Sequence, residues 1–317
     1  MAYNLIQFQQ GMSLPEFIQC FGSEAACVEA LQRARWPGGF VCPRCGGSAH
    51  CVVGSGSRRR FQCNACHVQT SMTAGTLFAS TKLPLTTWFL AIYLLSQAKT
   101  GLSALALKRQ IGVSYPTAWL MHHKVMKAMA DREAAHRLCG AVEVDDAYLG
   151  GERAGGKPGR GSENKVPIVA AVSLNDKGHP LYVKVTQVPG FTSDAIANWA
   201  RSNLTPGTAV LSDGLACFGA VTDAGCTHSV EIVGTRKPRD LPQFKWVNTV
   251  LGNLKTMLSG AYKSFGYSKY ADHYLGAFAY RFNRRFNLAD LVVRLVVDVC
   301  RTKATPLRVI RQAEVHF

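Results

Sequence analysis

Four residues of the chain have side chains of the kinds that metal-dependent phosphoryl transfer uses, three as possible metal ligands and one as a positive charge: Asp145, Asp213, Asn248 and Lys255. Carboxylate and amide oxygens are hard ligands that suit Mg2+. Two carboxylates a few ångströms apart repel each other unless a cation separates them. Two Mg2+ ions held about 4 Å apart could stabilise the attacking and leaving oxygens of a phosphodiester. The residue types therefore predict a two-metal site, provided that the fold brings them together.

The segment from residue 140 to residue 258 has an alternation of strands and helices that would position these groups. Short apolar runs predict five strands, at 141–145, 166–174, 181–188, 209–212 and 228–233. Longer periodic stretches predict three helices, at 193–202, 215–224 and 244–258. This β-β-β-α-β-α-β-α order is that of the ribonuclease H-like fold, in which the first and fourth strands are adjacent. Because ligands of an open α/β sheet gather at strand ends, we expect Asp145 and Asp213 at one edge of the sheet.

The helix predicted at 244–258 would supply the remaining groups. Asn248 and Lys255 are two helical turns apart, which places them on the same face. Asn248 would be the third metal ligand, with a neutral oxygen that holds the second ion less tightly, and Lys255 would contact a DNA phosphate. Asp146 is the alternative first ligand, although a strand would point it to the face opposite Asp145. Taken singly, each residue also fits a turn, a helix cap or a solvated surface, so the prediction rests on their combination.

Upstream of this segment, four cysteines form two Cys-x2-Cys knuckles with 17 residues between them: Cys42, Cys45, Cys63 and Cys66. Such spacing lets four thiolates converge on one tetrahedral ion, and the glycines after the first knuckle permit the tight turn. Four ligands leave no open position, so we expect a structural Zn2+ rather than a catalytic one. Four unrelated core cysteines are the alternative at this spacing.

Two further features predict DNA as the partner. Arg58, Arg59 and Arg60 lie between the knuckles, where they would contact phosphates or form a solvated face. After a helix predicted at 83–97, two further helices are predicted at 102–110 and 114–129, and this pair, joined at a break at Gly112, has the form of a helix-turn-helix. Its second helix would present polar and aromatic side chains to a groove: Tyr115, Thr117, Trp119, His122, His123 and Lys124. A plain helical hairpin is the alternative.

Composition and charge agree with a DNA-binding globular protein. The 317 residues are 47% hydrophobic, and 36 Lys and Arg against 20 Asp and Glu give a net charge of +16, which favours a polyanionic partner. The start of the chain lacks a secretory signal and no apolar run could span a membrane, so a cytoplasmic location is expected. We divide the chain into a helical lead-in, a zinc ribbon, a helical DNA-binding region, a catalytic domain and a C-terminal helix with its tail: 1–35, 36–80, 81–135, 140–290 and 291–317.

The motifs together resemble a known family. The zinc ribbon, the segments Glu-Val-Asp-Asp-Ala-Tyr-Leu-Gly-Gly, Ser-Asp-Gly and Val-Asn-Thr-Val-Leu-Gly-Asn-Leu-Lys, and the closing Tyr-Arg-Phe-Asn-Arg-Arg-Phe are similar to bacterial insertion-sequence transposases of the ISXO2-like branch. That branch pairs a zinc ribbon with a DDE-type catalytic domain in which Asn replaces the final Glu. The similarity extends from about residue 36 to residue 286.

The resemblance implies Mg2+-dependent cleavage of DNA by water and joining by a 3′-hydroxyl, at terminal inverted repeats and target DNA, by a homo-oligomer. Because Asn248 departs from the commoner Glu, Asn253 is a rival third ligand. The arginines of 280–285 would contact the DNA backbone or support the core. A zinc-ribbon transcription regulator and a transposase descendant that no longer cuts DNA are the alternative functions.

Overall fold

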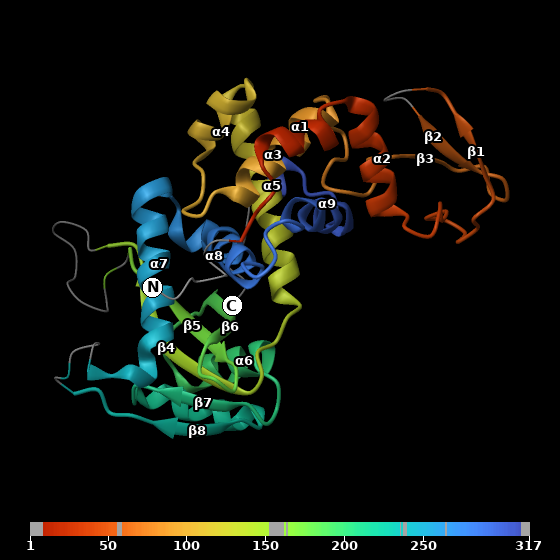
Figure 1. Ribbon diagram of the computed structural model, residues 1–317. Helices are drawn as coiled ribbons and strands as arrows, with labels where there is room; N and C mark the ends of the chain where they lie inside the picture. The colour runs from red at the N-terminus through yellow and green to blue at the C-terminus, as the bar shows by residue number, and fades with distance from the viewer. Residues whose placement is uncertain are drawn as a thin grey trace. The chain divides into compact units, whose positions relative to one another are not determined.

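The computed structural model separates the chain into two units (Figure 1). Residues 9–55, 59–151, 162, 164–234, 236, 240–263 and 265–311 are described. One unit consists of Met1–Ala128 with Phe286–Arg311, and the other contains Met129–Arg285. Residues 286–311 thus pack with the N-terminal part of the chain.

A small antiparallel sheet forms the ribbon of the first unit. Its strands, in the order β1-β2-β3, are His50–Val53, Arg60–Cys63 and Gln69–Ser71. Phe61 of β2 is buried and packs against Trp36 and Phe40, with ring centroids 4.9 and 5.3 Å away. The Arg35 guanidinium donates to the carbonyl of Ser71 over 2.7 Å, which fastens the preceding helix to the ribbon. So few apolar side chains form a small core, which is why such modules need a cross-link or a metal.

Helices make up the rest of the first unit. They are α1 (Leu14–Phe21), α2 (Glu24–Arg35), α3 (Leu85–Gln97), α4 (Ala104–Ile111), α9 (Leu291–Arg301) and α10 (Leu307–Arg311), together with the first part of α5 (Tyr115–Ala134). The last residues of α5, from Met129 on, belong to the second unit. Ser13 begins α1 with a capping box, because its hydroxyl accepts the Glu16 N–H and Glu16 accepts the Ser13 N–H. Helix α9 packs against α2 and α3, and this packing joins the C-terminal segment to the unit.

The predicted helical pair is present, but its second helix differs from the expected groove-facing helix. Helix α4 ends at Ile111 and is followed by Gly112, whose left-handed backbone (φ 69°) turns the chain towards α5. Lys124 is buried, donates from Nζ to the Leu77 carbonyl over 2.9 Å and lies over the Trp88 ring. His122 and His123 are each 1% exposed. The prediction that these three residues face a groove is therefore wrong, because this stretch of α5 lies inside the packed helices; Tyr115, at the start of α5, is exposed.

The second unit has one mixed sheet with the predicted fold. Its strands are β4 (Ala141–Leu149), β5 (Val166–Leu174), β6 (Pro180–Gln187), β7 (Ala209–Ser212) and β8 (Thr227–Val230). They lie in the order β6-β5-β4-β7-β8, antiparallel from β6 to β4 and parallel from β4 to β8. The first and fourth strands, β4 and β7, are neighbours, so the ribonuclease H-like α/β architecture is confirmed.

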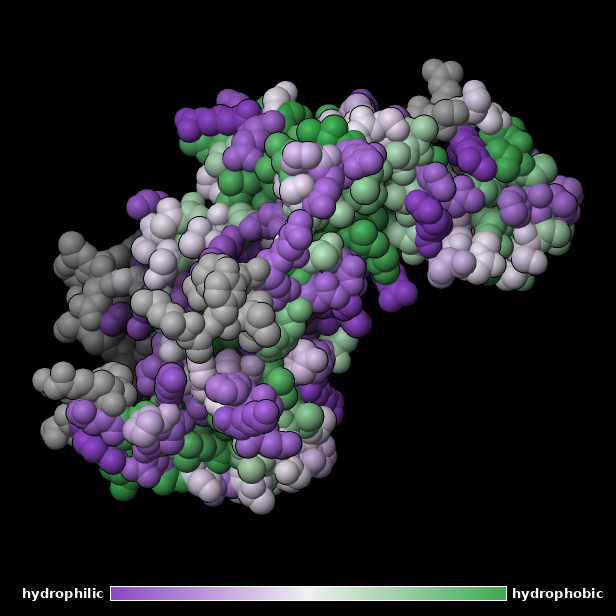
Figure 2. Space-filling view, viewed as in Figure 1, coloured by the Kyte–Doolittle hydropathy of each residue, from purple (hydrophilic) through white to green (hydrophobic). Residues whose placement is uncertain are grey.

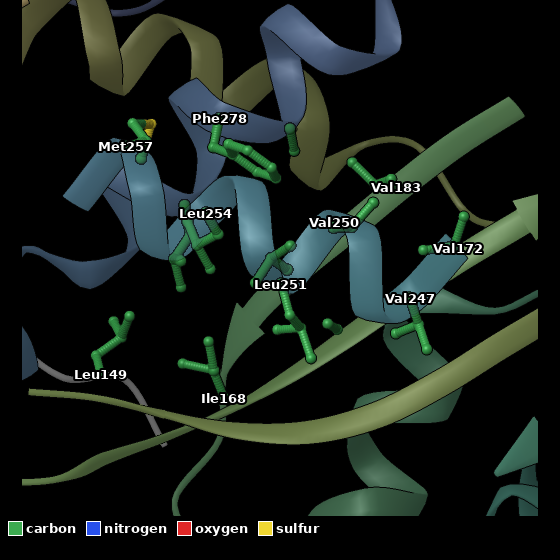
Figure 3. Close-up of a cluster of buried hydrophobic side chains, with 14 of the residues drawn as sticks. Leu149, Ile168, Val172, Val183, Val247, Val250, Leu251, Leu254, Met257 and Phe278 are labelled. Atoms are coloured by element: carbon green, nitrogen blue, oxygen red, sulfur yellow. The ribbon is translucent and has the colours of Figure 1, made fainter. Parts of the chain in front are cut away.

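Two separate apolar clusters cover the two faces of this sheet. On one face lie α6 (Ser193–Asn203) and a 3-10 helix (Ala216–Ala224). On the other lie α7 (Lys245–Met257), which ends in a π-helical turn at Leu258–Tyr262, and α8 (Tyr267–Asn283). Helix α7 buries an apolar stripe in the cluster drawn in Figure 3: Val247, Val250, Leu251, Leu254 and Met257. The stripe fixes which face of α7 meets the sheet.

The late arginine motif supports the core of the second unit. The Asn283 side chain pairs with Val183 of the edge strand β6, accepting its N–H over 2.7 Å and donating to its carbonyl over 3.0 Å. Arg284 forms a largely buried ion pair with Glu133. Arg285 donates to the Leu181 carbonyl over 3.0 Å. Of the two roles open for these arginines, the structure favours support of the core.

The visible surface has no single apolar face. In Figure 2, hydrophilic residues are spread over both units, with hydrophobic residues scattered among them. Within the described ranges, no helix combines the length and the apolar character that a membrane span needs.

Candidate functional site

Three carboxylates meet on the sheet of the second unit. One oxygen from each of Asp145, Asp146 and Asp213 lies within 4.8 Å of the others. Pairing of β4 with β7 explains the meeting of Asp145 and Asp213, because Glu143 is level with Leu211 and each aspartate follows two residues later. Side chains two residues apart on a strand share a face. The two aspartates therefore come together as predicted.

The place of Asp145 within its strand differs from the prediction. Strand β4 continues to Leu149, so Asp145 lies in its middle rather than at its end. The pairing with β7 nevertheless stops at Glu143, because β7 is only four residues long. The carboxylates thus gather where the shorter strand ends.

Asp146 belongs to this cluster, contrary to the expectation that it points away. Its backbone N–H donates to Asp145 Oδ1 over 2.8 Å, and its own carboxylate reaches the other two. Beyond Glu143 the ladder to β7 has ended, so a carboxylate from either face of β4 can reach this open edge. Strand alternation alone did not predict this because it ignores where the neighbouring strand ends.

A tight turn holds Asp213 in place. Its Oδ1 accepts the N–H of Leu215 over 3.2 Å. Between them Gly214 has φ 91°, and a Cβ on it would lie 3.1 Å from Val230 Cγ1. Both the positive φ and the close approach favour glycine at this position. The Asp-Gly pair therefore fixes the carboxylate at the end of β7.

Burial, together with the neighbouring carboxylates, raises the pKa of Asp145 to about 7. Burial is the largest cause, followed by the negative charges of Asp213 and Asp146. The Asp146 N–H and the positive charge of Lys255 act in the opposite direction. A carboxylate in this state gains from a bound cation, because the cation offsets the repulsion that otherwise retains the proton.

Helix α7 presents the other predicted residues. Asn248 is half-buried beside the apolar stripe, and its Nδ2 donates to the Phe244 carbonyl over 3.0 Å. With the amide nitrogen engaged in this bond, the carbonyl oxygen is the end suited to a cation. Lys255 is exposed, and its charge acts on Asp145. Asn253 is exposed too. The choice of Asn248 over Asn253 as third ligand stays a prediction.

Glu143 is a residue that the sequence analysis missed. It lies two residues before Asp145 and is 3% exposed. Its Oε2 accepts the N–H groups of Trp246 and Val247, over 3.1 and 2.8 Å, at the start of α7. A charged residue inside the apolar run that precedes Asp145 was the available signal.

In the first unit, the four knuckle cysteines converge. One sulfur from each lies within 4.8 Å of the others. The Cys42 and Cys66 sulfurs are 3.5 Å apart, as are those of Cys45 and Cys63. Tetrahedral Zn2+ with bonds of about 2.3 Å would hold sulfurs at roughly this spacing. The N–H groups of Cys45 and Arg44 lower the pKa of Cys42 to about 6, whereas the neighbouring cysteine side chains raise the pKa of Cys45. A bound cation would favour the thiolate form of all four.

The basic cluster is only partly described. Arg58 lies outside the described residues. Arg59 is half-buried, with its guanidinium 5.3 Å from the centre of the Phe61 ring. Arg60 is exposed on β2. Of the two described arginines, Arg60 therefore offers the more accessible charge.

Two segments of the chain, one including the cysteine cluster and one including the carboxylate cluster, match known protein families. A family model described as an ISXO2-like transposase domain matches residues 137–283, and one described as a transposase zinc-ribbon domain matches residues 22–69. The chain is 33% identical over 135 residues to an uncharacterized protein in transposable element ISH50 of Halobacterium salinarum. That alignment covers 42% of this chain and 44% of the relative, so the chain matches less than half of the relative's length. The two domain matches confirm the resemblance predicted from the motifs.

Proposed function

Because the chain belongs to the ISXO2-like transposases with an N-terminal zinc ribbon, we propose that it cleaves and joins DNA strands at the terminal inverted repeats of an insertion sequence. The observation that carries this proposal is the convergence of Asp145, Asp146 and Asp213 within 4.8 Å in a chain of net charge +16. A DNA-binding regulator has no use for carboxylates gathered at one point, since they repel DNA. A metal-dependent enzyme requires them.

The donor set fits Mg2+, which prefers carboxylate and carbonyl oxygens. Asp145 and Asp213 would hold two ions, and Asn248 would add its neutral carbonyl oxygen. Such ions, when bound, polarise the phosphodiester and activate the attacking oxygen. Asp146 supplies a further negative charge to the cluster. This charge would compensate for the neutral Asn248, where the commoner pattern has a glutamate.

The chain's other residues would position the DNA. Lys255 would pair with a phosphate beside the site, since it is exposed and its charge acts on Asp145. In cleavage, a water oxygen would bond to phosphorus as the P–O3′ bond breaks. The water would give one proton to solvent and the departing 3′-oxygen would take one up from solvent, which leaves a 3′-hydroxyl and a 5′-phosphate. In joining, that hydroxyl attacks a target phosphodiester, so one P–O bond forms as another breaks.

The ribbon would add affinity for DNA. We propose that Cys42, Cys45, Cys63 and Cys66 hold one structural Zn2+, which stabilises the sheet carrying Arg60. In the sequence, Arg58 and Arg59 directly precede Arg60. A homo-oligomer on DNA follows from the need to bring two element ends together.

Strand nicking separates this function from its rivals. The substrate is a duplex carrying the short inverted repeats that flank the reading frame. We expect wild-type protein to nick it with Mg2+ and not with EDTA, and Asp145→Ala to bind it without nicking. Binding without metal-dependent nicking by the wild type would favour the regulator or the inactive descendant.

A further inference from the structure

Glu143 connects the two halves of the proposed metal site. It shares a strand and a face with Asp145, two residues away, and its Oε2 is bonded to the backbone of Trp246 and Val247. Asn248 is the next residue along that helix. One strand therefore carries a metal carboxylate and also holds the helix that presents the third ligand.

The start of α7 depends on this distant carboxylate. Helix α7 has no side-chain cap of its own and no acidic residue in its first turn, where Lys245 places an unfavourable positive charge near the helix dipole. Glu143, more than a hundred residues earlier in the chain, supplies both the acceptor and the negative charge. The Glu143 carboxylate therefore takes the place of an N-terminal side-chain cap on α7.

Packing at this end of the helix is incomplete. A pocket of about 610 Å³ lies against it, lined by Glu143, Lys245 and Trp246 among others. Besides Glu143, the Trp246 indole N–H holds this end by donating to the Gly178 carbonyl over 2.6 Å. The apolar stripe keeps α7 on the sheet, but apolar packing is non-directional and permits a small slide or rotation. Directional bonds from Glu143 remove that freedom.

We infer that Glu143 is a positioning residue, which sets the place of Asn248 and Lys255 relative to Asp145 by fixing the start of α7. This inference rests on the proposed metal-dependent function. A shift of about 1 Å in a ligand is enough to weaken a metal site or slow a reaction about a hundredfold. Loss of Glu143 is therefore expected to leave the helix folded but its ligands misplaced.

The chain contains a matched control in its other unit. Glu24 accepts the N–H groups of Leu85 and Thr86, over 3.0 and 3.1 Å, at the start of α3, which also lacks a side-chain cap. Glu24→Ala removes the same kind of bond from a helix that carries no proposed ligand. It controls for the general cost of losing a carboxylate at a helix start.

The experiment measures two quantities for each full-length variant: the Mn2+ affinity, by calorimetry, and the single-turnover rate of DNA nicking. We expect Glu143→Ala to weaken Mn2+ binding about tenfold and slow nicking 10- to 100-fold. DNA affinity should fall by no more than about threefold, because Lys255 is one of many cations in a chain of net charge +16. Glu143→Gln keeps an oxygen acceptor and should stay within about threefold of wild type. Glu24→Ala should leave both quantities unchanged. If Glu143→Ala fails to fold, Glu143→Asp, whose shorter side chain cannot reach α7, replaces it with the same expectation.

A double variant tests whether Glu143 acts through the helix. In the Asn248→Ala background, Glu143→Ala should weaken Mn2+ binding less than twofold further, because the ligand it positions is already gone. If Glu143→Ala weakens Mn2+ binding a further tenfold in this background, the inference is contradicted. It is also contradicted if the single variant Glu143→Ala matches Glu24→Ala in both Mn2+ affinity and nicking rate. Failure of the proposed function would give a different result, in which wild-type protein binds Mn2+ but does not nick DNA. In that case, the Mn2+ affinities of the variants would still test the role of Glu143.

Discussion

Burial of Asp145 beside two other carboxylates predicts that its charge destabilises the metal-free protein. Its pKa of about 7 lies well above its ordinary value of 3.8, so the folded state holds the Asp145 proton more tightly than the unfolded chain does. Stability is therefore lost as the pH rises from about 4, where the unfolded chain ionises, to about 7, where the folded state ionises, and the full cost is present above pH 7. At 1.36 kcal/mol for each pH unit, the full difference corresponds to about 4 kcal/mol. Because Asp145 is only half-buried, solvent screening should reduce this to about 2–3 kcal/mol.

Asp145→Asn tests this prediction, because it removes the charge and keeps an oxygen for the Asp146 N–H. The variant should be more stable than wild type by about 2–3 kcal/mol at pH 8 in EDTA. The gain should shrink as pH falls below 7 and vanish near pH 4, where both states of the wild type are protonated. Hydrogen exchange of the β4 and β7 amides reports the stability of this unit alone.

Asp176→Asn is the matched control, since Asp176 is an exposed carboxylate in the turn between β5 and β6. It should change stability little at any pH. In saturating Mn2+, wild type should become more stable than Asp145→Asn, because only the wild type has the full set of metal ligands. A variant that is no more stable than wild type at pH 8, or whose gain is the same at pH 5, would refute the reasoning.

Three further predictions concern the ribbon, DNA affinity and the third ligand. Purified protein should contain about one zinc per chain, and Cys42→Ser should lose it and unfold the ribbon while the second unit stays folded, as metal analysis and proteolysis would show. DNA affinity should fall log-linearly with salt, and replacing Arg58–Arg60 by glutamine should reduce the slope by about 0.9 for each phosphate that an arginine no longer neutralises. Asn248→Ala should nearly abolish nicking, whereas Asn248→Asp should change the metal preference. If Asn248→Ala nicks at the wild-type rate, Asn253 is the next candidate.

Local patterns predicted most of the fold. The knuckle spacing and the strand periodicities are properties of short segments, so the cysteine cluster and the neighbouring β4 and β7 could be predicted from them. The meeting of Asp145 and Asp213 followed from strand order alone. These features need no knowledge of how distant side chains pack.

The incorrect or missing predictions depend on distant partners. The carboxylate of Asp146 joins the cluster because β7 is short, which the local sequence of β4 does not record. Lys124 looks like a surface residue on α5, yet it satisfies the Leu77 carbonyl in the interior. Glu143 holds a helix more than a hundred residues away. In each case a polar side chain is placed by a partner that lies far along the chain.

The central claim is that Asp213 binds a metal ion used in the reaction, and Asp213→Cys tests it most directly. A thiolate is a soft ligand that Mg2+ accepts poorly and Mn2+ accepts better. We predict that wild-type protein nicks terminal-repeat DNA with either ion, and that Asp213→Cys fails with Mg2+ and regains nicking with Mn2+. Nicking by Asp213→Cys at the wild-type rate in Mg2+, or no nicking by it with either ion although it binds the DNA, would contradict the claim.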